Sequence, residues 1–62
     1  MNLYYLYAHW SGGWFYAIVV ANNTLEIKTL LESKNYIFDE ASVKKIGTTD
    51  ICKEPEILIY CD

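Results

Sequence analysis

Apolar residues dominate the first third of the chain and mark two strands. Residues 3–10 and 14–21 consist almost wholly of aliphatic and aromatic side chains, and aromatic and β-branched types favour a pleated strand. Between them, Ser11-Gly12-Gly13 supplies the residues that tolerate the positive φ angles of a tight turn. The pattern therefore predicts strands Leu3–Trp10 and Trp14–Ala21, joined as a β-hairpin.

Alternation along these two strands leaves neither with a polar side. In the first strand one side carries Leu3, Tyr5, Tyr7 and His9, and the other carries Tyr4, Leu6, Ala8 and Trp10. In the second, Trp14, Tyr16, Ile18 and Val20 alternate with Phe15, Ala17, Val19 and Ala21. A sheet with one face in water normally shows a clean apolar–polar alternation. Its absence here indicates that both faces of the hairpin are apolar.

A short amphipathic helix follows the hairpin. Asn23, with Glu26 three residues later, matches a capping box, in which each side chain bonds a free backbone N–H of the first turn. The helix is predicted from Thr24 to about Lys34, and Asn35 is suited to a left-handed stop. Its apolar stripe consists of Ile27, Leu30 and Leu31, with Leu25 at the border. A helix this short is marginal alone and must dock on the sheet.

The second half of the chain contains weaker signals and one strong one. Tyr36-Ile37-Phe38 is predicted to plug the end of the core, and Asp39-Glu40-Ala41 is a polar link that leaves room for one helical turn. Ser42–Thr48 alternates weakly and predicts a third strand, ended by Gly47. After a loop over Thr49–Pro55, Glu56–Cys61 is strongly predicted as the last strand.

These elements predict a single small α+β domain over residues 1–62. The order is β-β-α-β-β, and we expect a mainly antiparallel four-stranded sheet with one helix packed on one face. One helix covers only one face of such a sheet, and large exposed apolar patches usually mark an interface. A chain of 62 residues has little interior to bury so many rings. We therefore favour an interface on the other face, or at the edge of the hairpin, over the alternative that the aromatic rings merely widen a small core.

Composition and charge exclude several classes of protein. The chain is 53% hydrophobic, too apolar for a disordered tail. It has a net charge of −3, five lysines and no arginine, a poor match to the basic patches that neutralise phosphates, so we expect no direct nucleic-acid binding. The carboxylates are scattered, which makes nucleic-acid mimicry a minor alternative. No apolar run is long enough for a membrane helix, and Met1-Asn2 lacks the positive flank of a signal peptide.

The two cysteines are expected to be free. An extended strand over Ile57–Cys61 carries Cys61 well away from the loop that holds Cys52, beyond the span of about 7 Å between Cα atoms that a disulfide bridges. Free thiols indicate a reducing compartment, and we expect a cytoplasmic protein.

No set of residues predicts chemistry. His9 is the single histidine, and no nucleophile or orienting acid accompanies it at a recognisable spacing. A metal site of His9, Cys52 and Cys61 lacks the closely spaced ligand pairs of structural zinc sites. Gly12-Gly13 lacks the Lys-Ser/Thr of a phosphate loop. We predict a non-enzymatic protein with no catalytic residue, no metal and no cofactor.

One tract resembles a known class of small proteins. The tract begins with Tyr16-Ala-Ile-Val-Val-Ala-Asn-Asn-Thr-Leu-Glu26 and continues to Leu31. Two further stretches follow it, Val43-Lys-Lys-Ile-Gly-Thr-Thr49 and Glu56–Tyr60. These stretches resemble the β-β-α-β-β proteins of bacteriophages and mobile elements, in which an "A-x-T-x-E" helix start and an "I-G-T" strand recur. The resemblance implies an inhibitor of bacterial immunity, of the anti-CRISPR or other anti-defence type, acting by stoichiometric protein binding in the host cytoplasm. It transfers no binding residue, and the aromatic hairpin departs from the pattern.

The sequence thus favours a protein-interaction module that binds a host defence protein and self-associates as a homodimer or higher homo-oligomer. The predicted partner-binding residues surround the hairpin: Tyr5, Tyr7, His9, Trp10, Trp14 and Tyr16. Tyr and Trp dominate the energetics of protein interfaces. Two alternatives stay open. One is an oligomer that sequesters a nucleotide-like small molecule by stacking its base on the rings, as a sponge protein does. The other is a structural accessory protein.

Overall fold

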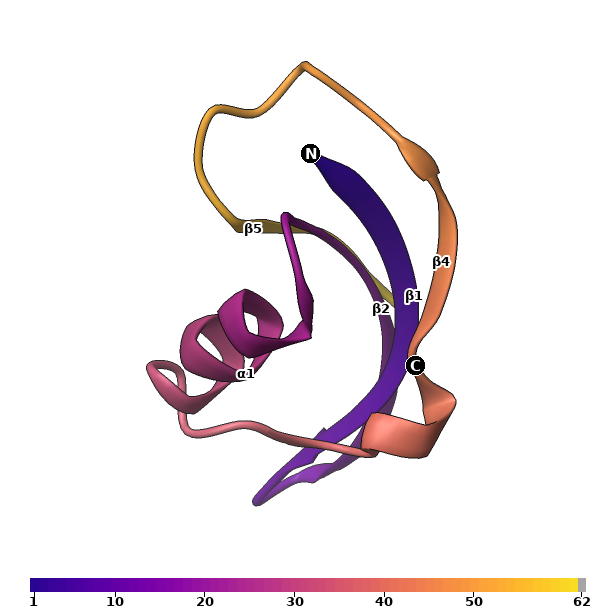
Figure 1. Cartoon of the computed structure of the whole chain (residues 1–62). Helices are drawn as coiled ribbons and strands as arrows, with labels where there is room; N and C mark the ends of the chain where they lie inside the picture. Colours follow the sequence, from indigo (N-terminus) through magenta and orange to yellow (C-terminus); the bar gives the residue numbers. More distant parts are fainter. Residues whose placement is uncertain (62) are drawn as a thin grey trace.

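Two long antiparallel strands form the centre of the structure (Figure 1). In the computed structural model, which describes residues 1–61, β1 spans Asn2–Trp10 and β2 spans Gly13–Ala21, with Trp10 opposite Gly13. The connection is therefore a two-residue turn, one residue shorter than predicted. Gly13 adopts a φ of 140°, a conformation that side chains disfavour. The hairpin prediction is confirmed, with each strand starting one residue earlier.

Three shorter strands complete the sheet. The order is β3-β1-β2-β5, with β4 also pairing to β1, and every pairing is antiparallel. The strands β3 (Ile37–Phe38) and β4 (Lys44–Thr48) lie one after the other along the same edge of β1, while β5 (Glu56–Cys61) pairs with β2. The predicted α+β class and β-β-α-β-β order are confirmed. The two-residue β3 is an addition, because four strands were expected.

A turn of 3-10 helix, Glu40–Ser42, separates β3 from β4 and explains why the third predicted strand was too long. The Ser42 hydroxyl donates to the Asp39 carbonyl at 2.6 Å and accepts from the backbone N–H of Tyr7 at 2.9 Å. That side chain therefore satisfies a β1 donor in the gap between the two short strands.

The helix α1 spans Thr24–Glu32 and is fixed at both ends. Asn23 Oδ1 accepts from the Glu26 N–H at 2.9 Å, as predicted, whereas Glu26 reaches back to the N–H of Asn22, also at 2.9 Å, rather than to that of Asn23. At the other end the Tyr36 N–H donates to the Leu31 carbonyl and Asn35, at a φ of 63°, takes the predicted left-handed stop. This is the Schellman arrangement, and the helix ends two residues before the predicted Lys34. Within residues 1–61, no helix is long and apolar enough to cross a membrane.

The core lies between α1 and one face of the sheet. Ile27 and Leu31 of the helix are fully buried, whereas Leu30 is half-buried and Leu25 is exposed. The strand residues of this core are Tyr4, Leu6, Ala8, Phe15, Ala17, Val19 and Ala21. β1 and β2 curve around the helix, so that α1 occupies the concave side of the sheet (Figure 1). The predicted packing of one helix on one face is confirmed.

The segment after the helix closes one end of this core only in part. Tyr36 and Phe38 pack against the core, and the Tyr36 ring lies edge-on to Phe15 with ring centroids 5.1 Å apart. Tyr60 of β5 joins the same cluster, 5.7 Å from Phe15. Ile37 is different: it is exposed and pairs with His9 on the other face of the sheet. The predicted plug is right for Tyr36 and Phe38 and wrong for Ile37.

Candidate functional site: an aromatic ladder on the open face of the sheet

The sheet surface opposite α1, here called the open face, carries a continuous row of five rings. In the β1–β2 register Tyr7 lies opposite Tyr16 and His9 lies opposite Trp14, and residues directly opposite one another share a face. Tyr5, one pair further along, lies diagonal to Tyr16. We call this row the aromatic ladder; its members, in order of contact, are Tyr5, Tyr16, Tyr7, Trp14 and His9.

Each ring of the ladder contacts the next across the two strands. Tyr5 and Tyr16 are stacked with centroids 5.5 Å apart, and Tyr7 and Trp14 are stacked at 4.7 Å with only 11° between their planes. The Tyr7–Tyr16 pair at 4.6 Å and the His9–Trp14 pair at 4.4 Å are tilted. Stacked pairs of this kind add to strand pairing. The ladder is therefore held in place before any partner arrives.

The ladder is exposed although it is apolar. Trp14 exposes 52% of its surface, Tyr16 41% and Tyr5 38%, while the middle ring, Tyr7, is half-buried between its neighbours. Alternation puts these rings on the face opposite α1, which lies on the concave side of the sheet (Figure 1). The prediction that the first hairpin carries an exposed aromatic surface is confirmed.

Trp10 does not belong to the ladder. It lies on the other side of β1, and its exposed indole folds over the hairpin turn, where a Cβ on Gly12 would collide with the ring. The glycine leaves room for the indole, which caps the tip of the hairpin. The structure thus brings five of the six predicted partner-binding residues together and places the sixth apart.

The other strands add four residues around the ladder that the sequence did not indicate. Ile59 and Cys61 of β5 lie opposite Ile18 and Tyr16, Ile37 of β3 lies opposite His9, and Lys44 of β4 lies opposite Tyr5. Their membership depends on which strands are neighbours, and no local pattern reports that. Alternation within β5 gives no reliable signal either, because the irregularity at Leu58 puts Ile57 on the core face and Ile59 and Cys61 on the open face.

The charge around the ladder differs from that of the whole chain. The chain has a net charge of −3, yet the strand neighbours of the ladder are apolar apart from Lys44. Glu56, which the register also assigns to this face, lies opposite Val20, at the far end of β2 from Trp14. Among the described residues, the strand neighbours that a partner meets at the ladder are therefore aliphatic side chains, a thiol and one ammonium group.

The open face has no set of groups arranged for catalysis. His9 is packed against Trp14. In the loop before β5, the Cys52 thiol donates to the Glu56 carboxylate at 3.3 Å, and this bond raises the pKa of Cys52, the opposite of what a reactive thiolate requires. Cys52 and Cys61 are both free. In residues 1–61 no three His, Cys, Asp or Glu side chains lie close enough together to hold a metal ion.

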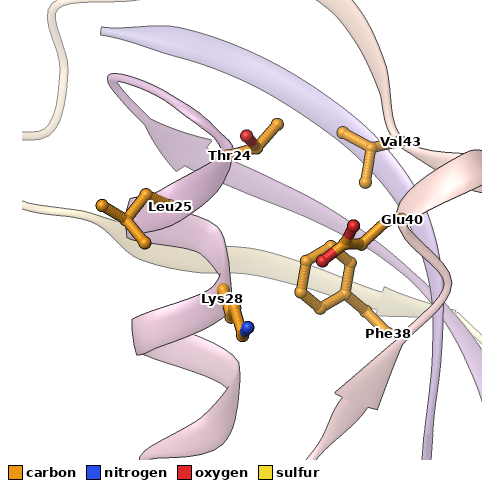
Figure 2. Close-up of a pocket in the computed structure, with 6 residues that line it drawn as sticks. All are labelled: Thr24, Leu25, Lys28, Phe38, Glu40 and Val43. Carbon is orange, nitrogen blue, oxygen red and sulfur yellow. The ribbon is translucent and has the colours of Figure 1, made fainter.

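A groove lies on the helix side of the molecule. It has a volume of about 380 Å³ and lies between α1 and the segment from β3 to β4. Figure 2 shows Glu40 beside the ring of Phe38 on one wall, and Lys28 and Leu25 of the helix on the other. The lining offers one carboxylate and one ammonium group but no histidine or cysteine.

Comparisons with protein-family models, with curated proteins and with solved structures gave no match to this chain.

Proposed function

We propose that the protein is a non-enzymatic interaction module that binds a partner protein stoichiometrically through the aromatic ladder. The observation that carries the proposal is the exposure of this ladder on the sheet face opposite α1. Contiguous apolar surface of this kind is rare on monomers unless something binds it. Tyr and Trp are also the residues that most often act as anchors in protein interfaces.

Two features of the ladder suit a protein partner. The rings are already stacked on one another, so binding freezes few side-chain rotations, which lowers the entropic cost of association. The open face is also the convex side of a curved sheet (Figure 1), a shape that fits a concave surface on a partner. A module of this form acts by occupying a surface that its partner needs.

In its more specific form, the proposal is a phage-type inhibitor that blocks a host defence protein in the cytoplasm of the host cell. This form rests on the resemblance of residues 16–31, 43–49 and 56–60 to small phage and mobile-element proteins. The two free cysteines accord with a reducing compartment.

The two tryptophans provide a matched test of the proposal. Both are about half exposed, but Trp14 is in the ladder and Trp10 is on the other side of the hairpin. The wild-type protein is used to capture its partner from a bacterial lysate, and the affinities of Trp14→Ala and Trp10→Ala for that partner are then measured by calorimetry.

We expect Trp14→Ala to cost about 2 kcal/mol or more, a loss of about 30-fold in affinity, if Trp14 is an anchor. Trp10→Ala is expected to stay near the wild-type value. Equal affinities for wild type and a correctly folded Trp14→Ala variant contradict the proposal, as does a larger loss in Trp10→Ala than in Trp14→Ala.

A nucleotide-like ligand is the second candidate, and Lys44 is the observation that favours it. This ammonium group lies opposite Tyr5 at the end of the ladder, where a base stacked on an exposed ring would bring a phosphate within reach. Thermal unfolding in the presence of mononucleotides separates the two candidates. A bound nucleotide raises the melting temperature of the protein alone by mass action, whereas the protein-binding proposal predicts no shift.

A further inference from the structure

The two edges of the sheet differ in how well they resist pairing with another strand. Within residues 1–61, β5 forms one edge: it pairs with β2 on one side, and no described strand pairs with it on the other. Its residues 57–61 carry no charge and no proline. Leu58, Ile59 and Tyr60 are all exposed, by 36% to 51%. An exposed apolar edge strand without lysine or proline is a template for pairing with another chain.

The opposite edge is protected by the devices that usually prevent such pairing. It consists of a strand of two residues and a strand of five, interrupted by the 3-10 turn Glu40–Ser42. The pairing of β4 with β1 contains an irregularity between Leu3 and Tyr4, and Lys44 and Lys45 are both exposed on β4. Short strands, irregular pairing and lysines each discourage the addition of a further strand.

We propose that β5 pairs antiparallel with β5 of a second copy of this chain, forming a two-fold symmetric dimer with one continuous sheet. A strand added head-to-tail, β5 against the β3–β4 edge, would build an open filament, and the protected edge opposes it. Pairing β5 with itself uses the edge of each copy that has no lysine, no proline and no interruption by a helical turn. The assembly therefore closes at two chains.

We place the two-fold axis at Ile59, the centre of the uncharged segment 57–61. Around a two-fold axis, an antiparallel pair sets one residue opposite itself. Leu58 then lies opposite Tyr60 of the second copy. The contact itself is without charge, but Glu56 and Asp62 flank this segment in the sequence, and like charges at its two ends weaken the dimer.

The dimer should be weak. The β2–β5 pairing has an irregularity between Ile18 and Val19 that leaves Leu58 as an extra residue. This irregularity shortens the stretch of regular backbone hydrogen bonds that β5 can offer to a second copy. An interface built on one strand of six residues, about 20 Å long, belongs to the class that buries less than about 1,200 Å². We therefore expect dissociation when the protein is diluted from about 1 mM to about 1 μM.

The dimer has a consequence that rests on the function proposed above. Antiparallel pairing about this axis keeps the two helices on one side of the joined sheet and the two aromatic ladders on the other. A partner with two matching surfaces would then bind both ladders at once, and its apparent affinity would exceed that for a single ladder.

A cysteine trap tests the register in the full chain. Cys52 and Cys61 are first replaced by Ser, and Ile59→Cys or Leu58→Cys is then introduced separately. Opposite residues in an antiparallel pair lie at the separation that a disulfide spans. We expect mild oxidation to convert the Ile59→Cys protein to covalent dimer at least ten times faster than the Leu58→Cys protein. Equal rates, or a faster rate for Leu58→Cys, overturn the register.

Sedimentation velocity over the same dilution series tests the dimer without cross-links. Ile59→Lys sets two ammonium groups against each other at the axis and should yield a monomer at every concentration. Ile46→Lys is the matched control, an exposed isoleucine on β4, and should dimerise like wild type. If the wild-type protein is a monomer at about 1 mM, the proposal is overturned, and the occupant of this edge is then a strand of another protein. A dimer that survives Ile59→Lys but not Tyr16→Lys also overturns it, because the open face is then the contact. Neither result depends on Trp14→Ala, which tests the partner site separately.

Discussion

The two faces of the sheet come from the same two strands, and both are apolar, yet one is core and the other is surface. The covered face combines small residues, Ala8, Ala17 and Ala21, with larger ones such as Leu6, Tyr4 and Phe15, and all of these are buried. The open face carries rings that stack against each other. Small side chains let a helix approach a sheet closely. The three alanines, rather than hydrophobicity, distinguish the face that α1 covers.

The difference predicts that substitutions on the covered face mainly affect stability, and those on the open face mainly affect binding. The largest effect is expected for Leu6→Ala, which removes a fully buried side chain beneath α1. Leaving such a cavity costs about 3 kcal/mol, a large part of the stability of a domain this small. Urea unfolding followed by circular dichroism measures the loss. A cost below about 1 kcal/mol contradicts the assignment of Leu6 to a tightly packed core, and Leu6→Met, which conserves volume, is the control.

A smaller effect is expected where the covering helix is fixed at its start. Asn23→Ala removes the oxygen that accepts the Glu26 N–H and should cost about 1 kcal/mol in the free energy of unfolding. Asn23→Ser restores an acceptor and is expected to recover most of it. If alanine and serine prove equally stable at this position in chemical denaturation, the cap does not hold α1 on the sheet.

At the end of the same helix, two substitutions of Asn35 are expected to change the stability differently. The alanine variant should lose about as much stability as Asn23→Ala, and the glycine variant should not lose any. Asn35 has a φ of 63°, where a Cβ is disfavoured and glycine is not. Asn35→Ala should lower the free energy of unfolding by about 1 kcal/mol and so lower the melting temperature. Asn35→Gly should leave the melting temperature unchanged or raise it. Calorimetric melting curves of the two variants that coincide would contradict the left-handed stop.

The smallest effect on stability is expected on the open face. Tyr5 is at the end of the ladder and stacks on Tyr16 alone, so Tyr5→Ala should cost about 0.5 kcal/mol in the free energy of unfolding. Tyr7→Ala, in the middle, breaks contacts with both Trp14 and Tyr16 and should cost about twice as much. Losses near 3 kcal/mol in urea unfolding would mean that the ladder is part of the core.

The sequence predicted most of the fold because its strongest signals are local. The hairpin, the Asn23 cap, the Asn35 stop and the bounds of β5 each depend on a few neighbouring residues. β3 was missed because a strand of two residues exists only through its pairing with β1. The β4 start was misplaced because Ser42 bonds to Tyr7, a residue 35 positions away.

The candidate site was predictable to the same extent. Period-two alternation assigns Tyr5, Tyr7, His9, Trp14 and Tyr16 to one face, and the hairpin register then brings them into contact. Trp10 is aromatic too, but along β1 it alternates with Tyr5, Tyr7 and His9 and therefore lies on the other face. The residues contributed by β3, β4 and β5 depend on strand order, which no stretch of this sequence encodes locally.

The most direct test of the open face as the binding surface is a backbone and side-chain NMR titration of the protein with its captured partner. The expected result is that the resonances of Tyr5, Tyr7, Trp14 and Tyr16 shift or broaden most, while those of Ile27 and Leu31 beneath the helix barely move. Perturbations that instead cluster along α1 and the groove of Figure 2, with the ladder unchanged, would contradict it.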